Sequence, residues 1–195
     1  MGLSERFLVW RLRRGDREAY RELVSRHHQR VYGYLRRLGA EASLAEDLTQ
    51  ETYAKAWRRI GTLRQSSSLR SWLLTIARNE FLQWVRVERP EVRPLDEVPE
   101  EADDGPDVER GLERSERDCA LRKAVGRLQP DLQETVALHY FQDLSFREVA
   151  AVLGVPPGTV KSRINRALRS LRTLLESTEA DHERPRAEKA FASDS

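Results

Sequence analysis

Apolar residues recur at steps of three and four along most of the chain, a spacing that predicts amphipathic α-helices. The stretch from residue 17 to residue 38 shows it well, because its apolar and aromatic positions fall on one helical face. These positions are Tyr20, Leu23, Val24, His27, Val31, Tyr34 and Leu38. We therefore expect an all-α protein.

Start and stop signals divide the first ninety residues into four helices. Ser4 opens the first and Gly15 ends it, because glycine readily adopts the left-handed conformation found at helix C-termini. Asp16 is placed to cap the second helix, which stops at Gly39.

The third helix is expected to begin with a capping box, in which Ser43 and Glu46 would each satisfy a free backbone N–H. It should end at Gly61 and lead into a short polar loop at residues 64–68. A fourth helix follows, and Pro90 closes this first domain.

A second helical domain opens around Asp118. Ser145 and Glu148 make a second capping box, Gly154 breaks the helix that follows, and Pro157 suits the first turn of the next one. A short helix, a turn with glycine and a further helix form the helix-turn-helix pattern. The last helix should run to about Glu176 and turn these residues inward: Val160, Ile164, Leu168, Leu171 and Leu175.

The second helix of this pattern is basic, with no acidic residue from Pro157 to Leu175. Recognition helices present their N-terminal turns to base edges in the major groove, where arginine pairs with guanine and lysine holds phosphate. An ordinary helix with a solvated basic face is the alternative. The helix break at Gly154, the capping box before it and the lack of acidic residues together favour DNA binding. The basic residues are Lys161, Arg163, Arg166, Arg169 and Arg172.

Charge is segregated along the chain although its net value is only +2. Residues 1–92 carry +7, residues 93–116 carry −7, residues 117–176 carry +4 and residues 177–195 carry −2. We therefore expect a helical domain, an acidic flexible linker, a helix-turn-helix domain and a polar tail that is disordered. The linker is either a solvated loop or an acidic strip that shadows a basic surface until a polyanion displaces it.

Composition narrows the class of protein further. Charged residues make up 34% of the 195 residues, and no apolar run approaches the roughly 18 residues of a membrane span. The N-terminus lacks the apolar core of a signal peptide, so we expect a soluble cytoplasmic protein. The single cysteine, Cys119, cannot form an internal disulfide, and the four histidines match no metal-binding spacing. We expect no catalytic residue, no metal site and no cofactor, hence no enzyme.

Residue chemistry alone leaves two clusters in the first domain with more than one possible role. The fourth helix mixes Trp72 and Trp84 with Arg78 and Asn79, so it could stack unpaired bases, although each tryptophan alone is better explained as core. The first turns of the third helix are acidic, which the helix dipole favours on its own. If those acids are functional, they face a protein partner that is basic there.

Three segments resemble bacterial RNA polymerase sigma factors: residues 45–52 (AEDLTQET), residues 69–79 (LRSWLLTIARN) and residues 144–155 (LSFREVAAVLGV). Residues 157–163 (PGTVKSR) continue the match. The length, the short linker and the lack of a third central domain are similar to the extracytoplasmic-function (ECF) group. The resemblance implies two helical domains, regions two and four, of an alternative sigma factor that recognises two promoter elements and assists melting.

The resemblance also implies roles for individual residues. The clamp helices of the largest subunit of core RNA polymerase would bind Asp47, Gln50 and Glu51. The minus-ten promoter element would be read, and an extruded base held, by Arg64, Ser66, Ser67, Ser68, Arg78 and Asn79. The minus-thirty-five element would contact Arg147, Thr159, Lys161, Ser162, Arg163 and Arg166. An anti-sigma protein is a further expected partner of this group.

One segment departs from the family pattern. Residues 83–88 (QWVRVE) close the fourth helix with one arginine and one glutamate, where the family usually carries a denser basic run. A different class of function also stays open: a stand-alone helix-turn-helix regulator whose first domain senses a signal or dimerises. Such a regulator would bind duplex DNA without polymerase and would not depend on Asp47 or Gln50.

Overall fold

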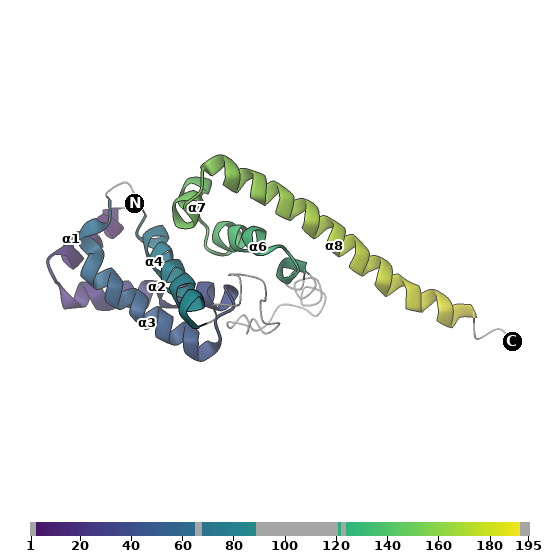
Figure 1. The fold of residues 1–195 in the computed structure, drawn as a ribbon, viewed down its shortest axis with the longest axis horizontal. Helices are drawn as coiled ribbons and strands as arrows, with labels where there is room; N and C mark the ends of the chain where they lie inside the picture. Colours follow the sequence, from purple (N-terminus) through teal and green to yellow (C-terminus); the bar gives the residue numbers. More distant parts are fainter. Residues whose placement is uncertain (1–2, 65–67, 89–120, 122–123, 192–195) are drawn as a thin grey trace.

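The computed structural model describes residues 3–64, 68–88, 121 and 124–191, and every regular element in these ranges is helical (Figure 1). The all-α prediction is confirmed. The first half contains α1 (Leu3–Arg13), α2 (Arg17–Arg37), α3 (Ala42–Arg59), the 3-10 turn η1 (Ile60–Thr62) and α4 (Leu69–Glu88). The second half contains α6 (Pro130–Val136), the π-helical turn η2 (Ala137–Phe141), α7 (Phe146–Leu153) and α8 (Pro157–Phe191).

Local signals fix most helix ends as expected. The Asp16 carboxylate accepts hydrogen bonds from the backbone N–H groups of Glu18 and Ala19 at the start of α2. Gly15 and Gly39, which follow α1 and α2, have φ angles of +75° and +94°. L side chains rarely adopt these angles, so glycine at these two positions lets the chain turn without strain.

The two predicted capping boxes have different outcomes. The box at Ser145 and Glu148 is present, with both reciprocal hydrogen bonds at the start of α7. The box at Ser43 and Glu46 is wrong, because α3 begins at Ala42 and its N-cap, Glu41, makes no side-chain capping bond. Ser43 already lies inside the helix, whereas an N-cap residue must have non-helical backbone angles.

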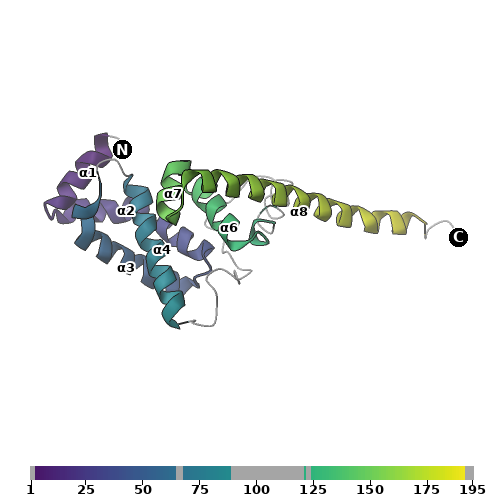
Figure 2. The ribbon, with the colours of Figure 1, turned by 45° about the horizontal axis from the view of Figure 1, so that its top comes forward.

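The buried apolar side chains form one continuous core through both halves. In the first half, α3 and α4 pack together and α2 packs against both (Figure 2). Tyr34 and Leu73 are fully buried there, and Trp72 and Trp84 pack partly buried against this core. The interpretation of each tryptophan as a core residue is therefore better in this arrangement than a role in base stacking.

The helix-turn-helix consists of α7 and α8, joined at Gly154, which has a left-handed φ of +69°. Helix α6 packs against α8. The expected inward position of Leu168 is wrong: its side chain is 46% exposed, and Ala167 is buried instead. At 100° per residue, Ala167 falls about 20° from Val160, on the side away from Ile164, and so stays on the buried arc, whereas Leu168 falls about 40° beyond Ile164.

The C-terminal part of the chain differs from the expected disordered tail. Helix α8 does not stop near Glu176 but continues to Phe191, so the polar tail begins as helix. Its content of alanine, glutamate, arginine and lysine favours that state. The acidic linker at 93–116 and Cys119 lie outside the described residues. Within the part of the chain that the structure describes, no helix has the length and apolarity of a membrane span.

Candidate polymerase and nucleic-acid interfaces

The acidic cluster of α3 lies on the surface. Asp47 and Gln50 are exposed and three residues apart, so they share one face of the helix. Neither makes a hydrogen bond or ion pair with another described residue. Glu51 is half-buried and is held by Arg58 at 2.9 Å and by Lys55 at 3.8 Å. Two of the three residues expected to meet the polymerase are therefore available for contact.

The loop and helix expected to read the minus-ten element are only partly accessible. Arg64 and Asn79 are exposed, and Ser68 is half-buried and accepts a hydrogen bond from the backbone of Ser71. Ser66 and Ser67 lie outside the described residues. Arg78, by contrast, is turned toward the second half of the molecule.

Arg78 of α4 pairs with Glu134 of α6, which sequence reasoning did not single out. Arg78 Nε lies 2.8 Å from Glu134 Oε1, and Nη2 lies 3.4 Å from Oε2. The hydroxyl of the fully buried Tyr34 donates to the same Oε1 at 2.7 Å. The Glu134 side chain is only 4% exposed, so Arg78 balances its charge and the neutral Tyr34 hydroxyl adds a hydrogen bond.

The pKa values of this trio follow from burial and charge. Burial raises the pKa of Tyr34 well above its usual value, and the Glu134 carboxylate raises it further. Burial lowers the pKa of Arg78, but the hydrogen bond and charge of Glu134 outweigh it, so the net shift is upward. Tyr34 therefore stays a neutral donor and Arg78 stays charged at neutral pH.

Further contacts join the two halves around this trio, where α4 lies beside α7 and α2 lies beside η2. The amide of Gln142 donates to the backbone carbonyl of Arg30 at 3.2 Å. Arg70 donates to the carbonyl of Asp143 at 3.1 Å, and the Arg37 guanidinium lies 4.6 Å from the ring centre of Phe141. The halves are thus docked through polar as well as apolar contacts.

No signal in the sequence reveals Glu134 as a contact of Arg78, because 56 residues separate them. Its neighbours Leu132 and Val136 mark the core face of α6, and Glu134 would be read as the solvated position between them. The π-helical turn that follows widens the last turn, with Gln142 N–H donating to the Ala137 carbonyl at 3.1 Å.

The basic face of α8 is open. Lys161, Ser162 and Arg166 are exposed on the first turns of this helix, and no described acidic side chain pairs with either cation. Arg163 differs, because its Nε lies 3.1 Å from Asp131 Oδ2 of α6 and its side chain is 21% exposed. Thr159 is half-buried on α8, and Arg147 is exposed on α7.

Family models match both halves of the chain in order. Sigma-70 region 2 matches residues 23–91, and Sigma-70 region 4 matches residues 120–171. The first match spans α3 and α4, and the second spans α6, α7 and the start of α8. The matched ranges include the acidic cluster of α3 and the whole of α7.

Several curated proteins are similar over most of this chain. The ECF RNA polymerase sigma factor BldN of Streptomyces coelicolor is 39% identical over 86% of this chain, which spans 64% of BldN. The ECF RNA polymerase sigma factor RpoE of Cereibacter sphaeroides is 35% identical over 80% of this chain and 86% of its own length. The RNA polymerase sigma-H factor of Pseudomonas aeruginosa is 30% identical, over 87% and 92% respectively.

Solved structures agree with this fold. The sigma factor RpoE of Bartonella quintana, crystallised with the anti-sigma factor NepR, has a TM-score of 0.65 and 30% identity over 80% of this chain and 96% of its own. CnrH, solved in complex with the cytosolic domain of CnrY, has a TM-score of 0.65 and 25% identity over 89% of this chain and 97% of its own.

Proposed function

The chain belongs to the ECF group of bacterial RNA polymerase sigma factors, alternative sigma factors for promoter recognition and transcription initiation, and from this premise we propose how its residues divide the work. Asp47 and Gln50 dock on the clamp helices of the largest polymerase subunit, with Glu51 beside them. The observation that carries this assignment is that both side chains are exposed on one face of α3 and bonded to no described neighbour.

The open face of α8 reads the minus-thirty-five element. Lys161, Ser162 and Arg166 would meet base edges and phosphates, together with the exposed Arg147 of α7 and the half-buried Thr159 of α8. Arg163 stays among the proposed contacts, but its ion pair with Asp131 gives it a second task, which is to hold α8 against α6.

The minus-ten element is assigned to Arg64, Ser68 and Asn79, with Ser66 and Ser67 of the same loop and with Arg78. Arg78 can meet a DNA strand only after it leaves Glu134, so we propose that promoter binding separates the two halves. The segments 1–92 and 117–176 act as the two domains in this scheme, and 93–116 links them. Extruding a base costs a few kcal/mol, which contacts to the freed strand must offset.

Partners and location follow from the family. An anti-sigma protein is a proposed partner, because the structurally similar sigma factor RpoE of Bartonella quintana was crystallised in complex with the anti-sigma factor NepR. We propose that the chain acts in the cytoplasm, where core polymerase works, and that it has no catalytic activity of its own. The stand-alone regulator is not favoured, because the region 2 match accounts for the first domain.

Capture of core RNA polymerase by the immobilised chain tests the docking surface. Asp47→Arg combined with Gln50→Ala should lower capture at least about tenfold, because a reversed charge meets a basic partner. Glu18→Arg with Gln29→Ala makes the same change of charge on exposed positions of α2 and should leave capture unchanged. Equal capture by the wild type and both variants would overturn the assignment to α3.

A further inference from the structure

Helix α1 carries two large aromatic side chains on the surface, outside the segment matched by the region 2 model. Phe7 is 60% exposed and Trp10 is 52% exposed, whereas Leu8, Val9 and Leu12 of the same helix are buried. Helix α1 therefore has a buried core face and, in addition, an aromatic outer face. The core face explains why α1 packs on α2, but nothing in the fold requires the aromatic pair to be where it is.

The aromatic pair is ordered into a stack. The rings of Phe7 and Trp10 have centroids 5.8 Å apart and planes inclined by 17°. The Arg14 guanidinium lies 4.6 Å from the centre of the Trp10 ring. We call Phe7, Trp10 and Arg14 the α1 aromatic face; it presents planar groups beside one cation.

Three cations on or next to α1 have no acidic partner in the described part of the chain. Arg6, Arg14 and Arg17 are exposed, and none of them pairs with an acidic side chain of the described residues. Glu5, the acid of α1, lies on the opposite side of the helix at 100° per residue. The α1 aromatic face therefore suits an occupant that is anionic and flat.

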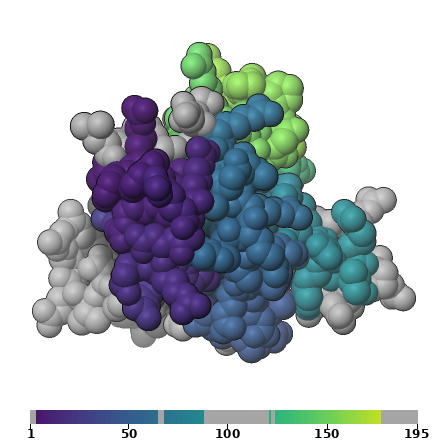
Figure 3. All heavy atoms as spheres, turned by 90° about the vertical axis from the view of Figure 1, so that its left-hand side faces the viewer, coloured from purple at the N-terminus to yellow at the C-terminus, as the bar shows by residue number. Residues whose placement is uncertain are grey.

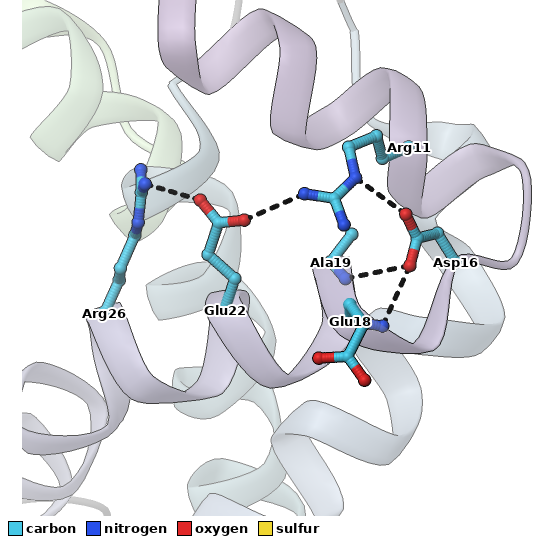
Figure 4. Close-up of polar contacts among 6 residues, drawn as sticks. All are labelled: Arg11, Asp16, Glu18, Ala19, Glu22 and Arg26. Carbon is cyan, nitrogen blue, oxygen red and sulfur yellow. Dashed lines mark hydrogen bonds and ion pairs between the residues drawn. The ribbon is translucent and has the colours of Figure 1, made fainter.

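Two of the neighbouring acids, Asp16 and Glu22, are already engaged, as Figure 4 shows. Arg11 Nε lies 2.7 Å from Asp16 Oδ2, and Arg11 Nη1 lies 3.1 Å from Glu22 Oε2. Glu22 also pairs with Arg26. The hydrogen bond from Arg11 and those from the backbone N–H groups hold the pKa of Asp16 below its usual value. This network fixes the corner between α1 and α2, and with it the orientation of α1.

The face adjoins the loop proposed for the minus-ten element. Arg13, three residues from Trp10, donates a hydrogen bond to the backbone carbonyl of Leu63 at 2.6 Å. Leu63 immediately precedes the loop at residues 64–68. Figure 3 shows α1 directly beside the η1 segment, with the second half of the molecule set behind and above them.

We infer that the α1 aromatic face binds unpaired bases of the melted promoter strand next to those held by the loop at 64–68. Stacking on Phe7 and Trp10 would hold the bases, and Arg6, Arg14 and Arg17 would hold the backbone. This inference rests on the proposed function, because it needs a melted strand delivered to that loop. It adds a single-stranded DNA contact from a helix outside the matched region.

The test uses core polymerase assembled with the full chain on a promoter that the wild-type chain transcribes, and it measures how long open complexes survive a heparin challenge. Trp10→Ala should shorten this lifetime at least about fivefold, because base stacking on the ring is lost. Trp10→Phe keeps a stacking ring and should stay within about twofold of the wild type. Tyr140→Ala removes an equally exposed aromatic ring, 52%, from the second half and should change nothing.

Removing single bases from the non-template strand locates the contact. One abasic position should shorten the wild-type lifetime but have no further effect on Trp10→Ala. Identical responses of wild type and Trp10→Ala at every position would overturn the inference, as would an unchanged lifetime of Trp10→Ala with normal transcription.

Reduced polymerase capture by Trp10→Ala would also overturn the inference, since the face would then be a protein-docking surface. A wild-type chain that transcribes from no promoter would overturn the proposed function and this inference with it. Far-UV circular dichroism confirms that each variant keeps its helices.

Discussion

The two DNA-reading surfaces proposed for this chain differ in what their basic side chains touch. On α8, Lys161 and Arg166 face solvent and pair with no described acid. On α4, Arg78 is 20% exposed and is bound to Glu134, which belongs to the other half of the molecule. The cations of α8 are open in this arrangement, whereas Arg78 of α4 serves as part of an internal interface.

This difference teaches that the same residue type can hold DNA or hold the protein together, depending on its neighbours. An arginine that balances a buried carboxylate cannot be moved to a phosphate without leaving that carboxylate unpaired. We therefore expect α8 to engage duplex DNA without rearrangement, and α4 to engage a DNA strand only when α6 moves away.

The largest expected effect comes from removing the carboxylate between the halves. Glu134→Ala leaves the Arg78 charge and the Tyr34 hydroxyl without their partner and should lower the free energy of unfolding by about 3 kcal/mol. Urea denaturation followed by circular dichroism measures the change.

A double variant separates the interaction between the two charges from the cost of burying each of them. Arg78→Ala combined with Glu134→Ala removes both charges, so its cost should be clearly less than the sum of the single changes. If each single variant lowered the free energy of unfolding by less than about 0.5 kcal/mol, and if these losses added up in the double variant, the contact would contribute nothing to docking of the halves.

A smaller effect should distinguish the two surfaces directly. In the free chain, Arg166→Ala should weaken binding to a duplex with the upstream element about tenfold, because an exposed cation loses its DNA contact. Arg78→Ala should leave that affinity unchanged, because Glu134 already occupies Arg78. Fluorescence anisotropy at fixed salt concentration measures both, and equal losses for the two variants would contradict the comparison.

The smallest expected effect concerns pH. Burial, together with the charges of Arg30, Arg70 and Arg26, lowers the pKa of His27 to about 4. The unfolded chain, with an ordinary pKa near 6.5, binds the proton more readily, so stability is lost as pH falls from about 6.5 toward 4. Because part of the ring reaches solvent, we expect a loss of about 1 kcal/mol between pH 7 and pH 5.

His27→Gln cannot titrate and serves as the matched variant. Its free energy of unfolding, measured by urea denaturation at both pH values, should lack this part of the pH dependence. If the free energy of unfolding changed equally with pH in the wild type and in His27→Gln, the pH dependence would belong to other groups.

Local signals predicted the helices and most of their ends. Asp16 caps α2 and Ser145 caps α7 as expected, because each motif involves atoms only two or three residues apart. Ser43 has the same pattern with Glu46 but does not cap, since the chain enters the helix earlier, at Ala42. A capping motif predicts that a helix begins nearby, whereas the packing of the preceding turn decides at which residue.

The candidate site was predictable in its residue types but not in its accessibility. The acids of α3 and the cations of α8 could be found because their neighbours in sequence are also their neighbours in space. The pairing of Arg78 with Glu134, and of Arg163 with Asp131, could not, because each depends on how separate helices dock. The exposed stack of Phe7 and Trp10 depends likewise on which face of α1 is buried.

The contact between Arg78 and Glu134 also influences the fraction of chains in which the two halves are separated. Each 1.4 kcal/mol by which the docked arrangement is favoured lowers tenfold the fraction of chains whose α4 is uncovered. The apparent affinity for a melted strand falls by the same factor. A polymerase surface that binds only the separated halves would restore it, and would thereby raise promoter affinity without touching DNA itself.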